Sequence, residues 1–183
     1  MQEDFQYPLE RFDGTHKNIK LIDKTNIHNN FLQVINQYEV HAEGADVTRD
    51  NRYDVTVLVN GLPLVHIELK RRGVDLKEAF NQINRYQRDS FWAEHGLFQY
   101  VQLFVISNGT YTKYYSNTTR FQAQQENANS NRNKKKTSNS FEFTSWWADA
   151  KNKPIYDLMG FGQTFFARHA LEDSDQLLCL YFG

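Results

Sequence analysis

Four polar side chains stand among apolar residues between positions 51 and 72, and their chemistry suits a site for a metal ion and a phosphate. They are Asp54, His66, Glu68 and Lys70. Mg²⁺ is a hard ion that keeps several waters and is commonly held by one or two carboxylates together with phosphate oxygens. A lysine beside such a site stabilises developing negative charge. These groups can act together only if the elements that carry them bring them into contact.

The segment around them is typical of a β-hairpin with Asn60-Gly61 at its turn. Alternate residues at 55–59 and 65–69 are apolar, so both sets should share one face. A two-residue loop would pair Val55 with His66 and mix apolar with polar positions, whereas the three-residue loop Asn60-Gly61-Leu62 matches them. The pattern therefore predicts the three-residue loop. Its pairs are Val59 with Pro63, Val57 with Val65, Val55 with Ile67 and Tyr53 with Leu69.

In this register Asp54 lies opposite Glu68 on the other face, and Lys70 lies two residues further along that face. Like charges directly opposite each other destabilise a sheet, so the two carboxylates need a partner. A divalent cation is one candidate. Lys70 alone, neutralising a solvent-facing patch, is the other, and spacing does not decide between them. In either case we expect that neither Lys70→Ala nor Glu68→Ala unfolds the domain.

The flanking sequence predicts a mixed α/β fold in one domain, residues 1–183. Asp75 and Glu78 form an N-cap and capping-box signature for a helix after Gly73, with apolar residues at helical spacing. Strands are expected at 31–40, 101–107, about 110–115 and, shorter, within 141–147. The polar stretch 116–140 is expected to be a mobile loop. This order indicates a mixed sheet with at least one helix packed on it.

The composition excludes several other classes of protein. The net charge is −1, so any nucleic-acid surface must be local. Cys179 is the single cysteine, which excludes an internal disulfide, and the six histidines show no zinc-binding spacing. No apolar run reaches about 18 residues and the N-terminus lacks the pattern of a signal peptide. We therefore expect a cytoplasmic protein that does not enter a membrane.

The predicted helix carries a second set of polar residues. Gln82 and Tyr86 are four residues apart, hence on one face, where they could orient a phosphate or the lysine. Arg85 and Arg88 could contact a neighbouring DNA phosphate. The alternative is structural: Tyr86 flanks the core, Gln82 is a surface amide, and the charges form a solvated helix face.

Together these motifs resemble the PD-(D/E)xK nuclease superfamily, in particular its RecB-like group with a Gln-x-x-x-Tyr motif. The segments "NQYEV", "RYDVTVLVNGLPLVHIELKRRG", "EAFNQINRY" and "LFVISNGTYTKYY" are similar to the N-terminal nuclease domain of the restriction (R) subunit of type I restriction-modification enzymes. The similarity covers roughly residues 17–160. It implies a restriction-endonuclease-like mixed central β-sheet flanked by helices.

The resemblance also implies an activity and a set of roles. The enzyme would cut double-stranded DNA with Mg²⁺, in a complex with modification and specificity subunits, after ATP-driven translocation. Asp54 and Glu68 would bind the metal, with the Leu69 carbonyl as a further ligand. Lys70 would position or help to deprotonate the attacking water, and Gln82 and Tyr86 would support the lysine or DNA.

Two features depart from the full R subunit. No glycine is followed by lysine, so the chain has no GxxxxGK phosphate loop and the ATP-binding motor is expected elsewhere. The sequence before the first predicted strand is short for the family, which suggests a fragment that is inactive alone. Two alternatives stay open: a non-catalytic module that docks on subunits or DNA, and a stand-alone repair exonuclease or junction resolvase.

Overall fold

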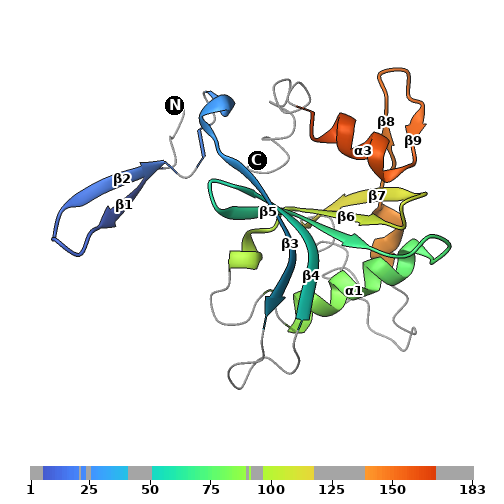
Figure 1. The fold of residues 1–183 in the computed structure, drawn as a ribbon, viewed down its shortest axis with the longest axis horizontal. Coiled ribbons are helices and arrows are strands. Elements are labelled where there is room, and N and C mark those ends of the chain that lie inside the picture. Colours follow the sequence, from blue (N-terminus) through green and yellow to red (C-terminus); the bar gives the residue numbers. More distant parts are fainter. Residues whose placement is uncertain are drawn as a thin grey trace.

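A five-stranded mixed sheet forms the centre of the computed structural model (Figure 1). The structure describes residues 6–20, 22–23, 26–40, 51–89, 91, 97–117 and 139–167. The strands lie in chain order across the sheet, and only β5 and β6 are parallel. The predicted mixed α/β fold and its long strands are confirmed. The strands are β3 (Leu32–Val40), β4 (Asn51–Val59), β5 (Leu62–Leu69), β6 (Leu103–Ser107) and β7 (Thr112–Ser116).

Helix α1 (Leu76–Asp89) connects the two parallel strands, followed by the short 3₁₀ helix η2 (Leu97–Tyr100). The predicted N-cap is confirmed, because the Lys77 N–H donates to Asp75 Oδ1 at 2.9 Å. The apolar stripe of α1 is buried against the sheet, which explains the helical spacing seen in the sequence. Its members are Leu76, Ala79, Phe80, Ile83 and Tyr86.

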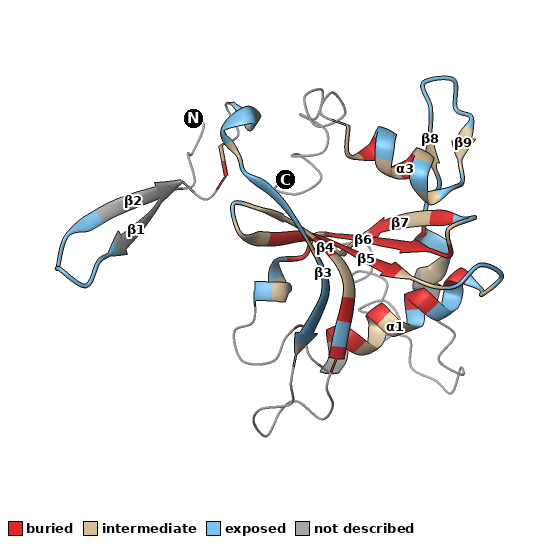
Figure 2. Cartoon of the chain, in the orientation of Figure 1, coloured by how far each residue is buried: buried red, intermediate tan, exposed pale blue. Residues whose placement is uncertain are grey.

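Both faces of the sheet are covered around β5 and β6 (Figure 2). One core lies between the sheet and α1, and a second lies between the sheet and helix α3 (Leu158–Phe165), which is capped by Asp157. Every residue of β5 from Pro63 to Glu68 is buried. The alternative of a solvent-facing patch is therefore wrong at Glu68, because α1 covers the face that carries its side chain.

The turn of the β4–β5 hairpin differs from the prediction. Asn60 (φ 51°) and Gly61 (φ 85°) form a two-residue turn, and Val59 pairs with Leu62 instead of Pro63. A β-bulge then restores the predicted register, since Leu58 pairs with Pro63 but Val57 pairs with Val65. Leu64 is the extra residue of this bulge, and it shifts the register by the one residue that the sequence interpretation had placed in a longer loop.

The β4–β5 pairing ends earlier than predicted. Its last pair is Val55 with Ile67, in the expected register. The predicted pair of Tyr53 with Leu69 does not form, because Tyr53 packs in the α1 core whereas Leu69 packs against the α3 core. The change of face shows that β4 twists away from β5 just beyond Val55, which frees the backbone of Leu69 for another partner.

The remaining described elements are short. A separate hairpin, β1 (Gln6–Glu10) and β2 (His16–Lys20), stands apart from the central sheet (Figure 1), and η1 (Ile27–Asn29) leads into β3. The strand predicted within 141–147 is wrong for its first part, which is the 3₁₀ helix η3 (Asn139–Phe143). It is followed by β8 (Trp147–Ala148) and β9 (Pro154–Ile155). Residues 118–138 of the expected loop, and Cys179, lie outside the described residues.

Candidate active site

Glu68 and Lys70 form an ion pair at the carboxyl end of β5. The Glu68 side chain is completely buried, and its Oε1 lies 3.0 Å from Nζ of Lys70, which is 19% exposed. The other oxygen, Oε2, is buried and has no hydrogen-bond partner. A buried carboxylate oxygen without a partner is costly, so this atom is the clearest sign of a ligand site on the strand.

Asp54 occupies the adjoining end of β4. Its Oδ2 accepts a hydrogen bond of 2.8 Å from the Leu69 N–H, at the point where the β4–β5 ladder has ended. The carboxylate thus replaces a backbone carbonyl as the acceptor. The bond holds Asp54 to the residue between Glu68 and Lys70, and so brings the two predicted acids and the lysine to one edge of the hairpin.

Gln82 and Tyr86 link Lys70 to β4 through side-chain hydrogen bonds. Lys70 Nζ donates to Gln82 Oε1, and Gln82 Nε2 donates to the Tyr86 hydroxyl. That hydroxyl donates to the Arg52 carbonyl at 2.9 Å. Burial raises the pKa of the Tyr86 phenol, and the charge of Glu68 adds to the effect. Gln82 and Tyr86, four residues apart on α1, therefore hold the lysine in place. The alternative that Gln82 is only a surface amide is wrong.

Helix α1 carries the two arginines that were predicted to contact DNA, Arg85 and Arg88. The Arg85 guanidinium lies over the Tyr86 ring, 5.3 Å from its centroid. The backbone of Arg88 belongs to α1, but its side chain lies outside the described part of the structure. Arg85 is thus placed beside the Gln82–Tyr86 link, and its contact with DNA stays a prediction.

His66 is a site residue to which the sequence reasoning assigned no role. Its side chain is fully buried and Nε2 lies 3.5 Å from Glu68 Oε2, but neither ring nitrogen has a hydrogen-bond partner. The ring packs edge-on against Tyr53, Tyr86 and Phe91. The sequence did indicate that His66 lies near Glu68, since the two are two residues apart and strand alternation places both on one face.

The donor set of this edge suits a hard divalent cation. Asp54 and Glu68 supply carboxylate oxygens, and the buried Oε2 of Glu68 accepts no hydrogen bond. Among the described residues, no group of three or more histidine, cysteine, aspartate or glutamate side chains could hold a metal. Two carboxylates are the kind of donor that a hard cation such as Mg²⁺ takes together with water and phosphate oxygens, so the residues present fit such an ion.

A mixed sheet with acid, acid-x-Lys and Gln-x-x-x-Tyr at one edge is the architecture expected of the PD-(D/E)xK superfamily. Sequence comparison identifies the branch. The family described as "Type I restriction enzyme R protein N terminus" matches residues 1–123, and the chain belongs to this family. The resemblance inferred from the motifs is therefore confirmed.

Several curated proteins are similar over most of the chain. The Escherichia coli type I restriction enzyme EcoprrI endonuclease subunit is 48% identical over 171 residues, which are 93% of this chain and 48% of that protein. The Staphylococcus saprophyticus SsaAORF53P endonuclease subunit is 41% identical over 86% of this chain and 14% of its own length. The putative Methanocaldococcus jannaschii MjaIXP endonuclease subunit is 37% identical over 55% of this chain and 9% of that protein.

The chain thus spans about half the length of the Escherichia coli relative and a much smaller part of the staphylococcal one. Within the described ranges, the structure contains no helix that is both long and apolar enough to cross a membrane.

Proposed function

We propose that this chain is the Mg²⁺-dependent endonuclease part of a type I restriction enzyme and that it hydrolyses phosphodiester bonds of double-stranded DNA. The observation that carries the proposal is the buried Glu68 carboxylate beside Asp54, with one oxygen on Lys70 and the other 3.5 Å from His66 Nε2 but without a hydrogen-bond partner. A purely structural ion pair with Lys70 gives no reason to bury the second oxygen without a hydrogen bond. A metal ligand does.

Each residue has a role in this proposal. Asp54 and Glu68 would hold Mg²⁺, with the Leu69 carbonyl as a further ligand, and the bound ion would polarise the phosphate and a water molecule. Two of the three N–H bonds of Lys70 are used by Glu68 and Gln82, which leaves one for the attacking water or a phosphate oxygen. Gln82 and Tyr86 hold Lys70 in place, and Arg85 and Arg88 would contact neighbouring phosphates.

The rest of the activity would be supplied by other parts of the complex. ATP-driven translocation would come from a motor that this chain lacks, because it has no GxxxxGK loop. Modification and specificity subunits would provide DNA recognition and assembly. We propose a cytoplasmic location, where the DNA substrate lies.

Metal binding by the chain tests the site directly. We expect titration calorimetry to show Mn²⁺ binding to the wild-type chain, with affinity lost in Asp54→Asn and in Glu68→Gln. Glu39→Gln, which removes an exposed acid on β3, is the matched control and should bind like the wild type. If the wild-type chain binds no metal, or the site variants bind as well as the control, the chain is a docking module and not a nuclease.

Cleavage by the assembled complex tests the reaction. A complex that contains Asp54→Ala should hydrolyse ATP at the wild-type rate but leave DNA uncut, since the motor is separate from this site. Cleavage that persists in this variant would place the chemistry elsewhere. Cleavage by the isolated chain without ATP or other subunits would instead favour a stand-alone repair nuclease.

A further inference from the structure

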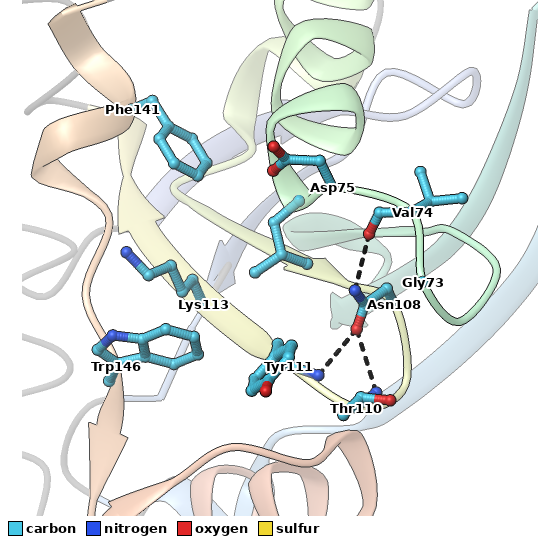
Figure 3. Close-up of a pocket in the computed structure, with 10 residues that line it drawn as sticks. Gly73, Val74, Asp75, Asn108, Thr110, Tyr111, Lys113, Phe141 and Trp146 are labelled. Atoms are coloured by element: carbon cyan, nitrogen blue, oxygen red, sulfur yellow. Dashed lines mark hydrogen bonds between the residues drawn. The ribbon is translucent and has the colours of Figure 1, made fainter.

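A cavity of about 630 Å³ lies beyond the carboxyl end of β5, separate from the candidate active site. It is bounded by the start of α1, the turn between β6 and β7, and the segment from η3 to β8 (Figure 3). None of Asp54, Glu68 and Lys70 lines it. Its volume is in the range of sites that hold a small organic ligand.

Partly exposed aromatic rings form one wall of the cavity. Tyr111 and Trp146 are 49% and 37% exposed, and their ring centroids lie 6.1 Å apart. Tyr156 packs edge-on against Trp146, with ring centroids 4.9 Å apart. Large aromatic rings left open to solvent inside a hollow are stacking surfaces for a planar ligand.

Lys113 supplies a positive charge beside these rings (Figure 3). Its Nζ lies 4.8 Å from the Trp146 centroid and 5.3 Å from that of Phe141, and it donates to Thr144 Oγ1 at 3.0 Å. Among the described residues no carboxylate lies within ion-pair distance of it. Burial also lowers the pKa of the Lys113 ammonium. A partly desolvated cation with neutral partners only is suited to an incoming anion.

The opposite side of the cavity is polar and differs in charge. The Asp75 carboxylate lies there, with one oxygen occupied by the Lys77 N–H. The Asn108 side chain is held in the turn, since it donates to the Val74 carbonyl and accepts from two turn N–H groups. A phosphate is therefore favoured at the Lys113 side and disfavoured at the Asp75 side, where N–H groups of a ligand would find an acceptor.

We propose that this cavity binds an unpaired base of the DNA strand, with the base stacked on Tyr111 or Trp146 and its phosphate at Lys113. The inference rests on the proposed function, which makes DNA the ligand. Three peptide units separate Lys70 from Gly73 at the rim, so the Cα atoms of these two residues are at most about 11 Å apart. That length corresponds to about three base steps at 3.4 Å each.

Arg72 lies between the two sites. Its side chain lies against Gly109 in the β6–β7 turn, where a Cβ would be 3.7 Å from Nε. The side chain is exposed, so the guanidinium is available to a phosphate on the path from Lys70 to the cavity. A strand whose scissile phosphate is at Lys70 would meet this second cation before its base reaches the aromatic wall.

Photocrosslinking tests the proposal. The probe is a short DNA duplex that carries one unpaired iodouracil, mixed with the full chain in buffer without divalent metal. We expect crosslinks, mapped by mass spectrometry, at Tyr111 or Trp146. Tyr111→Ala and Trp146→Ala should raise the dissociation constant for the probe by about 5-fold to 150-fold, which is the range for loss of one base–aromatic stack. Trp146→Leu keeps apolar contacts without stacking, and should be equally weak.

Matched controls separate this site from general DNA binding. Tyr100→Ala removes a phenol that is 47% exposed on η2, and Lys153→Ala removes an exposed charge on the β8–β9 hairpin. Both should bind like the wild type, whereas Lys113→Ala should bind more weakly and with a shallower salt dependence. A probe with an abasic site at the unpaired position should lose the Tyr111 and Trp146 effects.

Two results would overturn the proposal. One is crosslinking only outside the cavity. The other is a dissociation constant that is unchanged by the abasic probe and by all the cavity variants, which would leave the hollow to a protein partner. The probe is bound in the absence of metal, and metal binding is titrated in the absence of DNA, so neither measurement depends on the other. Failure of metal binding at Glu68 and failure of base binding in the cavity are therefore separate outcomes.

Discussion

Lys70 and Glu68 are joined by a 3.0 Å ion pair in which the carboxylate has no solvent exposure and the lysine has little. The pair is held between β5 and α1, and its second carboxylate oxygen lies 3.5 Å from the buried ring of His66. The charge of Glu68 is therefore balanced inside the fold, by a residue that is also proposed to act on the substrate. This arrangement has consequences for stability as well as for catalysis.

Lys70→Ala should destabilise the protein without unfolding it. It leaves a buried carboxylate without its cation, which costs about 3 to 5 kcal/mol in a fully buried pair and less here, about 2 kcal/mol, because Lys70 is partly exposed. Lys70→Ala with Glu68→Gln should be more stable than Lys70→Ala alone. Urea unfolding without metal measures both, and equal stability of Lys70→Ala and wild type would contradict the burial argument.

His66→Phe should separate stability from activity. The ring lies among aromatic side chains and both its nitrogens are buried without hydrogen bonds, so an apolar ring of similar shape should not lower the melting temperature. DNA cleavage by the complex and metal affinity should fall by about 10-fold to 100-fold, since Glu68 loses the polar neighbour that orients it. Unchanged metal affinity would show that the ring only fills space.

Tyr86→Phe should change how stability depends on alkaline pH. Burial raises the pKa of the phenol above its ordinary value of 10.0, so folding favours the neutral form. The stabilisation of the folded state that follows from this raised pKa is fully present below pH 10.0. It is lost as the pH rises through the pKa of the phenol in the folded protein. The variant cannot ionise there, and its free energy of unfolding should fall less steeply above pH 10.0. Tyr100→Phe, at an exposed phenol, is the control. A parallel decline in wild type and Tyr86→Phe would contradict the assignment.

Gly61→Ala should destabilise the hairpin that carries the site. Gly61 has φ +85°, a conformation that costs an L-residue about 1 to 2 kcal/mol. Gly162→Ala is the matched control, because Gly162 is helical in α3 and nothing lies within 4 Å of an added Cβ. That variant should be stabilised by about 0.5 to 1 kcal/mol. Thermal unfolding of the two variants should therefore shift in opposite directions, and a shift in the same direction would mean that the turn is not as described.

Local patterns were sufficient to predict most elements of the fold. Strand alternation, the Asp75 cap and the apolar stripe of α1 are short-range signals, and the structure contains the elements that they indicate. The hairpin turn was predicted wrongly because the sequence interpretation required one regular register from the turn to Asp54. A bulge at Leu64 allows a tight turn and the required register together. Bulges leave little trace in a hydrophobic pattern.

The sequence by itself determined the side chains of the site and the order of the elements that carry them, because alternation and helical spacing are properties of the local backbone. Only the tertiary structure decided that Glu68 is fully buried, that His66 lies beside it, and that Gln82 binds Lys70. These outcomes depend on how α1 packs across the sheet, and packing between distant segments is not encoded in the spacing of neighbouring residues. The same holds for the cavity, whose walls come from three separate parts of the chain.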